Sequence, residues 1–138
     1  MSSESGDGVE VVQRFFELMD SHQFDELDSV LAEELVFRMG PNTLDRSSLV
    51  EMIKVAYKAF PDFTHHVHEI FAKGDRVVAR GTNTGTHLGD LNGMAPTGRS
   101  IQFDQIAIYR VTDGRLREAW EQSDVATFNA QLTGERET

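Results

Sequence analysis

The spacing of hydrophobic residues is helical before Pro61 and changes to strand-like alternation after it. The first apolar stripe recurs every three or four residues, which predicts a helix that begins at Val9 and packs on a core. Its members are Val12, Phe15, Phe16 and Met19. Residues 1–8 before it are rich in Ser, Gly and acidic side chains, and we expect them to form a disordered tail.

Two further helices are predicted before the change in spacing. A short one follows the first, with Asp25 or a neighbour as its cap and Leu27, Val30 and Leu31 facing inward. A longer one begins after its N-cap Asp45 and ends at Pro61. Its apolar stripe consists of Leu49, Met52, Ile53, Ala56 and Phe60. Between these helices, the apolar residues 35–37 indicate a short strand that is broken at 40–42.

Four long strands are predicted in the rest of the chain, because apolar residues alternate there with a period of two. They cover about residues 63–73, 76–87, 99–111 and 115–125. Turns at 73–75 and 112–114 join them into hairpins, and a short helix (126–132) and a polar tail (133–138) follow. This order predicts one α+β domain over residues 9–132, with the helices on one face of a strongly curved antiparallel sheet and a conical cavity between them.

Composition narrows the classes of partner. The chain has 138 residues, no cysteine, and 23 acidic against 13 basic side chains, for a net charge of −10. This charge repels phosphate backbones and anionic membranes, so no nucleic acid partner is expected. No apolar run approaches the roughly 18 residues that span a membrane. Because the start does not have the pattern of a signal peptide either, we expect a cytoplasmic protein.

The last predicted strand carries the strongest candidate chemistry. Strict alternation places Leu116, Glu118, Trp120, Gln122 and Asp124 on one face. That face combines the only Trp of the chain with an amide and two carboxyls, which fits the wall of a half-apolar pocket. Two roles remain open for Asp124: an acid/base group inside the pocket, or the N-cap of the helix that follows.

Further polar candidates lie on the neighbouring strands. His87 shares a face with Asn83 and with glycines that leave space for a ligand or a close-packed helix; it is either a pocket residue or a loop anchor. His65 is expected to point inward. His66 and His68 share the opposite face, and no third ligand is evident beside them, so no metal site is expected.

The third long strand places Gln105 and Tyr109 on one face, and Phe16 on the first helix is both a core residue and a candidate pocket wall. The loop of residues 88–98 mixes glycines with Leu91 and Met94. Two readings of this loop stay open: a lid over the cavity mouth, or a connection packed on a dimer partner.

Five short motifs follow one another along the chain: Ala59–Phe63, Gly74–Val78, Gly85–Gly89, Pro96–Arg99 and Tyr109–Trp120. This ordered series resembles the SnoaL-like polyketide cyclases, within the nuclear-transport-factor-2-like fold, over about residues 9–132. The resemblance implies a cone-shaped α+β barrel with a cofactor-free pocket, usually a homodimer through the outer face of the sheet. In these cyclases an aspartate near the end of the last strand is the acid/base of an intramolecular aldol condensation, and Asp124 matches that position.

The resemblance therefore implies an enzyme that acts on an apolar, carbonyl-containing small molecule. Around the catalytic Asp124, the expected substrate-binding residues are Trp120, Gln122, Gln105, His87, Asn83, His65, Phe16 and Tyr109. Related cyclases often carry a His or Asp on the third long strand, where this chain has Gln105 and Ala107, so Asp124 would work alone. The alternatives are a non-catalytic binding or accessory domain, and an isomerase or hydrolase that uses the same cavity.

Overall fold

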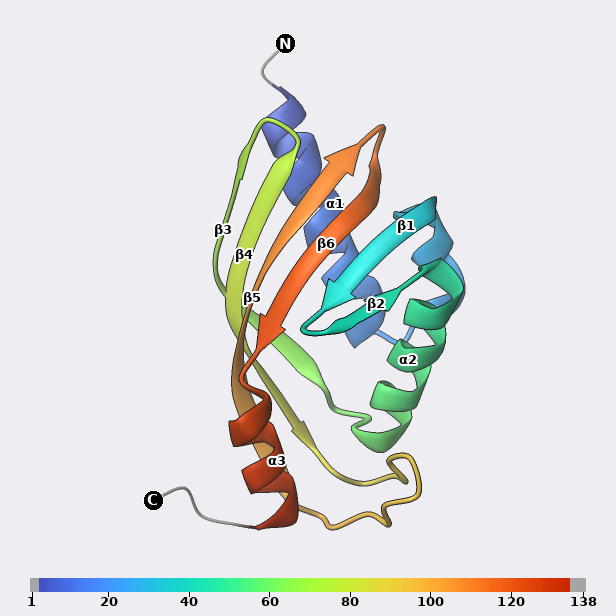
Figure 1. Ribbon diagram of the computed structural model, residues 1–138, viewed down its shortest axis with the longest axis vertical. Helices are drawn as coiled ribbons and strands as arrows, with labels where there is room; N and C mark the ends of the chain where they lie inside the picture. Colours follow the sequence, from blue (N-terminus) through green and yellow to red (C-terminus); the bar gives the residue numbers. More distant parts are fainter. Residues whose placement is uncertain (1–2, 135–138) are drawn as a thin grey trace.

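Helices cover the concave face of a curved sheet in the computed structural model, which describes residues 3–134. Helix α1 (Ser3–Asp20) and helix α2 (Arg46–Ala59) lie on this face, a 3-10 helix (Phe24–Ser29) follows α1, and α3 (Val125–Thr133) lies at one end of the sheet (Figure 1). Helix α1 begins at Ser3, so it includes most of the segment predicted as a tail. The ends of the two predicted tails, residues 1–2 and 135–138, lie outside the described residues.

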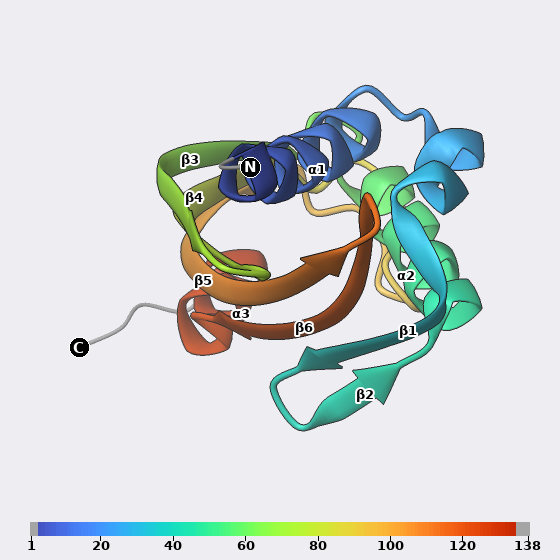
Figure 2. The same cartoon turned by 90° about the horizontal axis from the view of Figure 1, so that it is seen from above.

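The sheet contains six strands in the spatial order β2-β1-β6-β5-β4-β3. They are β1 (Leu31–Met39), β2 (Asn42–Leu44), β3 (Thr64–Lys73), β4 (Arg76–Thr86), β5 (Ser100–Thr112) and β6 (Arg115–Ser123). The predicted α+β fold is confirmed, and the four long strands form the expected antiparallel meander. One pair differs from that pattern, because β1 runs parallel to β6. Figure 2 shows the sheet curving around α1 without closing into a complete barrel.

The helices form where the sequence provides a stripe and a cap. The four residues of the α1 stripe are between 0% and 7% exposed and enter the core. Helix α2 begins after Asp45, whose carboxylate accepts a hydrogen bond from the backbone N–H of Ser48 at 2.9 Å. It ends at Ala59, just before the Phe60-Pro61 pair. These two helices therefore present their apolar faces to the concave side of the sheet.

A β-bulge in β6 reverses the faces predicted for this strand. Arg110 on β5 pairs with Glu118 and the next residue, Val111, pairs with Leu116, so Arg117 is an extra residue on β6. An extra residue shifts every later side chain to the opposite face. The prediction that Leu116 and Trp120 share a face is therefore wrong: Leu116 is buried, whereas Trp120 lies on the convex face.

Beyond the bulge, two side chains that the pattern placed outside face the core. Ala119 is fully buried and Glu121 is 9% exposed. Trp120 instead contacts the guanidinium groups of Arg38 and Arg76, at 4.9 and 5.0 Å from its ring. The bulge thus decides which β6 side chains meet the helices.

The convex face of the sheet carries a row of apolar side chains. Pairing across the strands aligns Phe71, Val78, Ile108 and Trp120 in register. Phe71 is 53% exposed and Ile108 is 41% exposed.

Within the described part of the chain, no helix is long and apolar enough to cross a membrane.

Candidate active site

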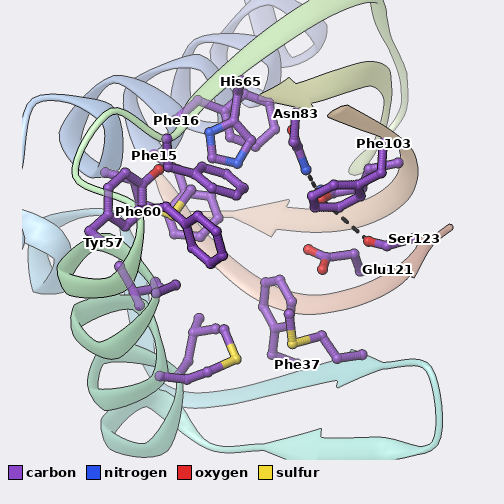
Figure 3. Close-up of a pocket in the computed structure, with 18 of the residues that line it drawn as sticks. Phe15, Phe16, Phe37, Tyr57, Phe60, His65, Asn83, Phe103, Glu121 and Ser123 are labelled. Atoms are coloured by element: carbon purple, nitrogen blue, oxygen red, sulfur yellow. Dashed lines mark hydrogen bonds between the residues drawn. The ribbon is translucent and has the colours of Figure 1, made fainter. Parts of the chain in front are cut away.

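A cavity of about 320 Å³ lies between the concave face of the sheet and helices α1 and α2. Its size suits a small organic molecule. Most of its wall is aromatic or aliphatic, and Figure 3 shows the rings of Phe15, Phe16, Phe37, Phe60 and Phe103 around it. The polar side chains in the wall are Tyr57, His65, Asn83, Gln105, Tyr109, Glu121 and Ser123. An apolar space with a few convergent polar groups is typical of a ligand site.

Glu121 is the only carboxyl among the cavity-lining residues that the structure describes. Its side chain points into the cavity (Figure 3). No side chain of the described residues forms a hydrogen bond with it, and burial alone raises its pKa from 4.5 to about 7. A carboxyl with that pKa exchanges protons close to neutral pH, so it suits acid/base chemistry.

Two residues of β5 shape the surroundings of Glu121. Ala107 pairs with Glu121 across the strands and offers only a methyl group. Tyr109 lies two residues further along β5, is fully buried, and has a hydroxyl without a hydrogen-bond partner. Burial and the negative charge of Glu121 raise the pKa of Tyr109 well above its ordinary value, so the phenol keeps its proton. An unpaired buried donor costs free energy, which an oxygen atom of a ligand would offset.

An amide network forms the wall beside Glu121. Asn83 on β4 donates a hydrogen bond from Nδ2 to Oε1 of Gln105 at 2.6 Å, and the Ser123 hydroxyl donates to the same oxygen at 3.5 Å. These contacts are drawn as dashed lines in Figure 3. With its oxygen occupied by two donors, Gln105 is left with its NH₂ group as a donor for a ligand.

A second polar group enters the cavity from β3. His65 is stacked on Phe16 with a centroid distance of 4.7 Å. Its Nδ1 lies 2.8 Å from Oδ1 of Asp20, the last residue of α1. Asp20 also accepts a hydrogen bond from the Tyr57 hydroxyl at 2.6 Å. Helix α1, helix α2 and strand β3 therefore meet at this carboxylate.

Five of the nine predicted site residues line the cavity. These are Phe16, His65, Asn83, Gln105 and Tyr109. The four that do not are Trp120, Gln122, His87 and Asp124. Trp120 belongs to the convex face, and Gln122 is exposed. Both errors follow from the bulge in β6, which the assumed alternation did not include.

Asp124 and His87 have structural positions. Asp124 is exposed and caps α3, accepting from the backbone N–H of Thr127 at 3.1 Å and from its hydroxyl at 2.7 Å. These hydrogen bonds lower the pKa of Asp124. Of the two roles left open for Asp124, acid/base group or N-cap, the side chain has the position of the N-cap. His87 is fully buried beside Phe60 and accepts a hydrogen bond from the backbone N–H of Thr97, which makes it a loop anchor.

Sequence reasoning missed Glu121, Ser123 and Asp20. Glu121 and Ser123 were assigned to the outer face by the same alternation error. Asp20 meets His65 across 45 positions of sequence, and a helix end followed by a turn carries no sign of that contact. Within residues 3–134, no group of His, Asp and Glu side chains is arranged to hold a metal ion. Leu91, from the loop of residues 88–98 whose two readings stay open, lines the cavity.

Comparison with known proteins gives a consistent result. The family model described as SnoaL-like polyketide cyclase matches residues 9–132. Among characterised proteins, aklanonic acid methyl ester cyclase AcmA of Streptomyces galilaeus is 30% identical over 131 residues, which cover 90% of this chain and 89% of the relative. The family model extends over the cavity-forming helices and strands.

Solved structures share the same fold. IdmH of Streptomyces antibioticus superimposes with a TM-score of 0.80 at 29% identity, covering 91% of this chain and 98% of that one. AclR of Streptomyces galilaeus superimposes with a TM-score of 0.87 at 22% identity, covering 97% of this chain and 85% of that one. The α1, α2 and curved-sheet arrangement described above is thus common to these proteins.

Proposed function

The chain belongs to the SnoaL-like polyketide cyclase family, and from this membership we propose that it closes a ring in an apolar polyketide by an intramolecular aldol reaction. Glu121 is the acid/base group of this proposal, and no cofactor takes part. The observation that carries it is a nearly buried carboxyl, without a hydrogen-bond partner among the described residues, that faces an apolar cavity.

Glu121 acts first as a base. An aldol closure begins with removal of a proton from the carbon next to a carbonyl. A carboxylate that is poorly solvated accepts a proton more readily than one in water, and burial raises the pKa of Glu121 to about 7. At neutral pH a large fraction of the protein therefore carries the basic form, and that form is a stronger base than an exposed carboxylate.

The enolate formed in this step needs hydrogen-bond donors at its oxygen. The unpartnered Tyr109 hydroxyl and the NH₂ group of Gln105 are the donors that this wall of the cavity offers. Neither needs to lose an existing partner to reach the substrate. In our proposal they hold the carbonyl oxygen while Glu121 removes the neighbouring proton.

The substrate class follows from the wall and from the relatives. The aromatic rings from α1, α2, β3 and β5 favour a flat, largely apolar substrate. The oxygen atoms of this substrate should lie next to the polar side chains of the cavity. AcmA is named for aklanonic acid methyl ester, and we propose this compound or a close analogue as the first substrate to test.

The test is incubation of the protein with aklanonic acid methyl ester, followed by chromatography with mass detection. Ring closure moves a proton and forms a C–C bond without changing the composition, so the expected product has the mass of the substrate at a new retention time. Saturable binding with unchanged recovery of the compound would contradict the enzymatic proposal and favour a binding domain. A gain of the mass of one water would favour a hydrolase.

The cavity favours the cyclase over a hydrolase of the epoxide type. Such a hydrolase needs an additional Asp and an Arg around a water molecule. Among the cavity-lining residues that the structure describes, Glu121 is the single carboxyl and no Arg is present. One carboxylate beside neutral donors matches proton removal next to a carbonyl better.

We also propose that two copies of the chain pair through the convex face of the sheet. The row formed by Phe71, Val78, Ile108 and Trp120 leaves apolar surface exposed in register across four strands. Light scattering should give the mass of a dimer, and Ile108→Asp should shift it to that of a monomer. A monomeric mass for the unaltered protein would contradict this part of the proposal.

A further inference from the structure

The Asp20 carboxylate is held by three hydrogen bonds. Oδ1 accepts from the Tyr57 hydroxyl at 2.6 Å and from Nδ1 of His65 at 2.8 Å, and Oδ2 accepts from the backbone N–H of His65 at 3.0 Å. Burial acts to raise the pKa of Asp20, but the hydrogen bonds and the charge of His65 outweigh it and lower the pKa. Asp20 is thus an anion at neutral pH, and it accepts all three bonds.

This anion fixes the state of the His65 ring. Because the carboxylate can only accept, Nδ1 must carry a proton. The backbone contact to Oδ2 and the stacking on Phe16 hold the ring in one orientation. Nε2 is therefore the atom left to exchange a proton, and no residue of the described chain forms a hydrogen bond with it. The side chain of His65 is 10% exposed, and it lines the cavity.

His65 and Glu121 enter one cavity from different strands. In Figure 3 His65 lies at the top of the cavity and Glu121 below it, with Phe15 and Phe60 beside the space between them. On β5, the strand beside β6, Ala107 stands opposite Glu121 and offers no second proton carrier. The polar group that could fill this role comes instead from β3.

We propose that His65 is the second catalytic residue of the cavity, a proton donor through Nε2, and that Asp20 is its positioning residue. This inference rests on the proposed aldol closure and names the group that completes it. Glu121 takes the proton from carbon, and the enolate carbon bonds to the second carbonyl carbon. The His65 ring, which must carry a second proton on Nε2 for this step, gives that proton to the alkoxide that forms. The substrate gains and loses one proton, so its mass is unchanged. Glu121 and His65 then recover their first states by exchange with water.

The proposal also restricts the substrate. The second carbonyl oxygen must reach His65 while the first lies at Tyr109 and Gln105. The molecule taken is therefore a dicarbonyl. His65 pairs across the strands with Asn83, which donates a hydrogen bond to Gln105, so the two carbonyl groups must reach neighbouring positions of the same wall. A monoketone would be deprotonated by Glu121 without ring closure.

The test compares turnover of aklanonic acid methyl ester by matched variants. We expect His65→Gln to lower kcat about 100-fold or more, the usual scale of general acid catalysis, with KM changed less than about threefold. Asp20→Asn, which removes the charge but keeps an oxygen acceptor, should lower kcat about 10-fold or more at similar KM. The control is His66→Gln, the same substitution on the exposed side of the same strand, where the ring forms a hydrogen bond with the Thr84 hydroxyl.

A second readout separates catalysis from packing. Imidazole added to His65→Ala should restore turnover, whereas it should not restore Glu121→Gln, because only the former lacks the proton donor. Equal kcat for His65→Gln and His66→Gln would overturn the proposal while leaving the function of Glu121 intact. The His65 proposal would also be overturned if Glu121→Gln lost activity while His65→Gln and Asp20→Asn kept it.

A third readout does not depend on turnover. If the unaltered protein does not convert the compound, the proposed function fails for this substrate, and the state of the His65 ring still tests the pair. Long-range ¹⁵N–¹H correlation, assigned by the signal missing in His65→Gln, should show the neutral ring protonated on Nδ1, and Asp20→Asn should reduce that preference. A ring protonated on Nε2 in the unaltered protein would overturn the assignment of Asp20.

Discussion

Replacing Glu121 by Gln should stabilise the protein at high pH and leave its stability at low pH nearly unchanged. Gln has almost the same shape but never carries a charge. The buried carboxyl has a pKa of about 7 in the folded chain, against an ordinary value of 4.5. Below 4.5 the carboxyl is protonated in both states, so it contributes no penalty. As the pH rises toward 7 the unfolded chain ionises first, and the folded state loses stability until the folded carboxyl also ionises.

The size of this loss follows from the difference between the two pKa values. At about 1.4 kcal/mol for each unit of pKa, the difference between 4.5 and about 7 corresponds to about 3 kcal/mol. Glu121 is 9% exposed, so solvent screens the penalty little. The free energy of unfolding of Glu121→Gln should therefore exceed that of the unaltered protein by about 3 kcal/mol at pH 8.5 and by much less at pH 4.5.

The assay is urea denaturation at intervals between pH 4.5 and 9, with the difference between the two proteins plotted against pH. Other titrating groups cancel in that difference. Glu118→Gln is the matched control, because Glu118 lies on the same strand but is paired with Arg38 and Arg110, whose hydrogen bonds lower its pKa. The ion pairs of Glu118 stabilise the folded chain above the ordinary pKa of this carboxyl, and that stabilisation is lost as the pH falls. Glu118→Gln should therefore be less stable than the unaltered protein at pH 8.5. A difference for Glu121→Gln that stays flat with pH would refute the reasoning.

Three further outcomes are expected. Because Glu121 must be ionised to act as a base, kcat/KM should rise with pH in a step whose midpoint lies at about 7; a rate without such a rise between pH 5 and 8 would contradict this. Tyr109→Phe removes a buried unpaired hydroxyl, so it should raise the free energy of unfolding by about 1 kcal/mol. It should also lower kcat about 100-fold, and an unchanged kcat would contradict the role of this hydroxyl. Asp124→Ala removes the cap of α3 and should lower stability by about 1 kcal/mol at unchanged kcat; a loss of activity without a loss of stability would restore Asp124 to the site.

Regular spacing allowed much of the fold to be predicted. The helices α1 and α2 follow from their apolar stripes, and Asp45 is a cap with an ordinary sequence signature. The face of β5 that contains Gln105 and Tyr109 was assigned correctly, because β4 pairs with β5 along the whole length of β4 without an irregularity. Where the pairing is regular, alternation gives the side that each residue faces.

The site was only partly predictable, because two of its features are not local. A single extra residue, Arg117, turns Glu121 inward and Trp120 outward, and nothing in the residues themselves marks the bulge. The Asp20–His65 pair joins a helix end to a strand far along the chain, so only the tertiary fold reveals it. The parallel pairing of β1 with β6 is likewise a property of chain topology.

The central claim is that the acid/base group of this family member is Glu121 inside the cavity and not Asp124 at the helix cap. The most direct measurement is the turnover of aklanonic acid methyl ester by Glu121→Gln and Asp124→Asn, assayed together with the unaltered protein. We predict that Glu121→Gln lowers kcat about 1,000-fold, while Asp124→Asn keeps it within about twofold. Full activity in Glu121→Gln, with activity lost in Asp124→Asn, would contradict the account.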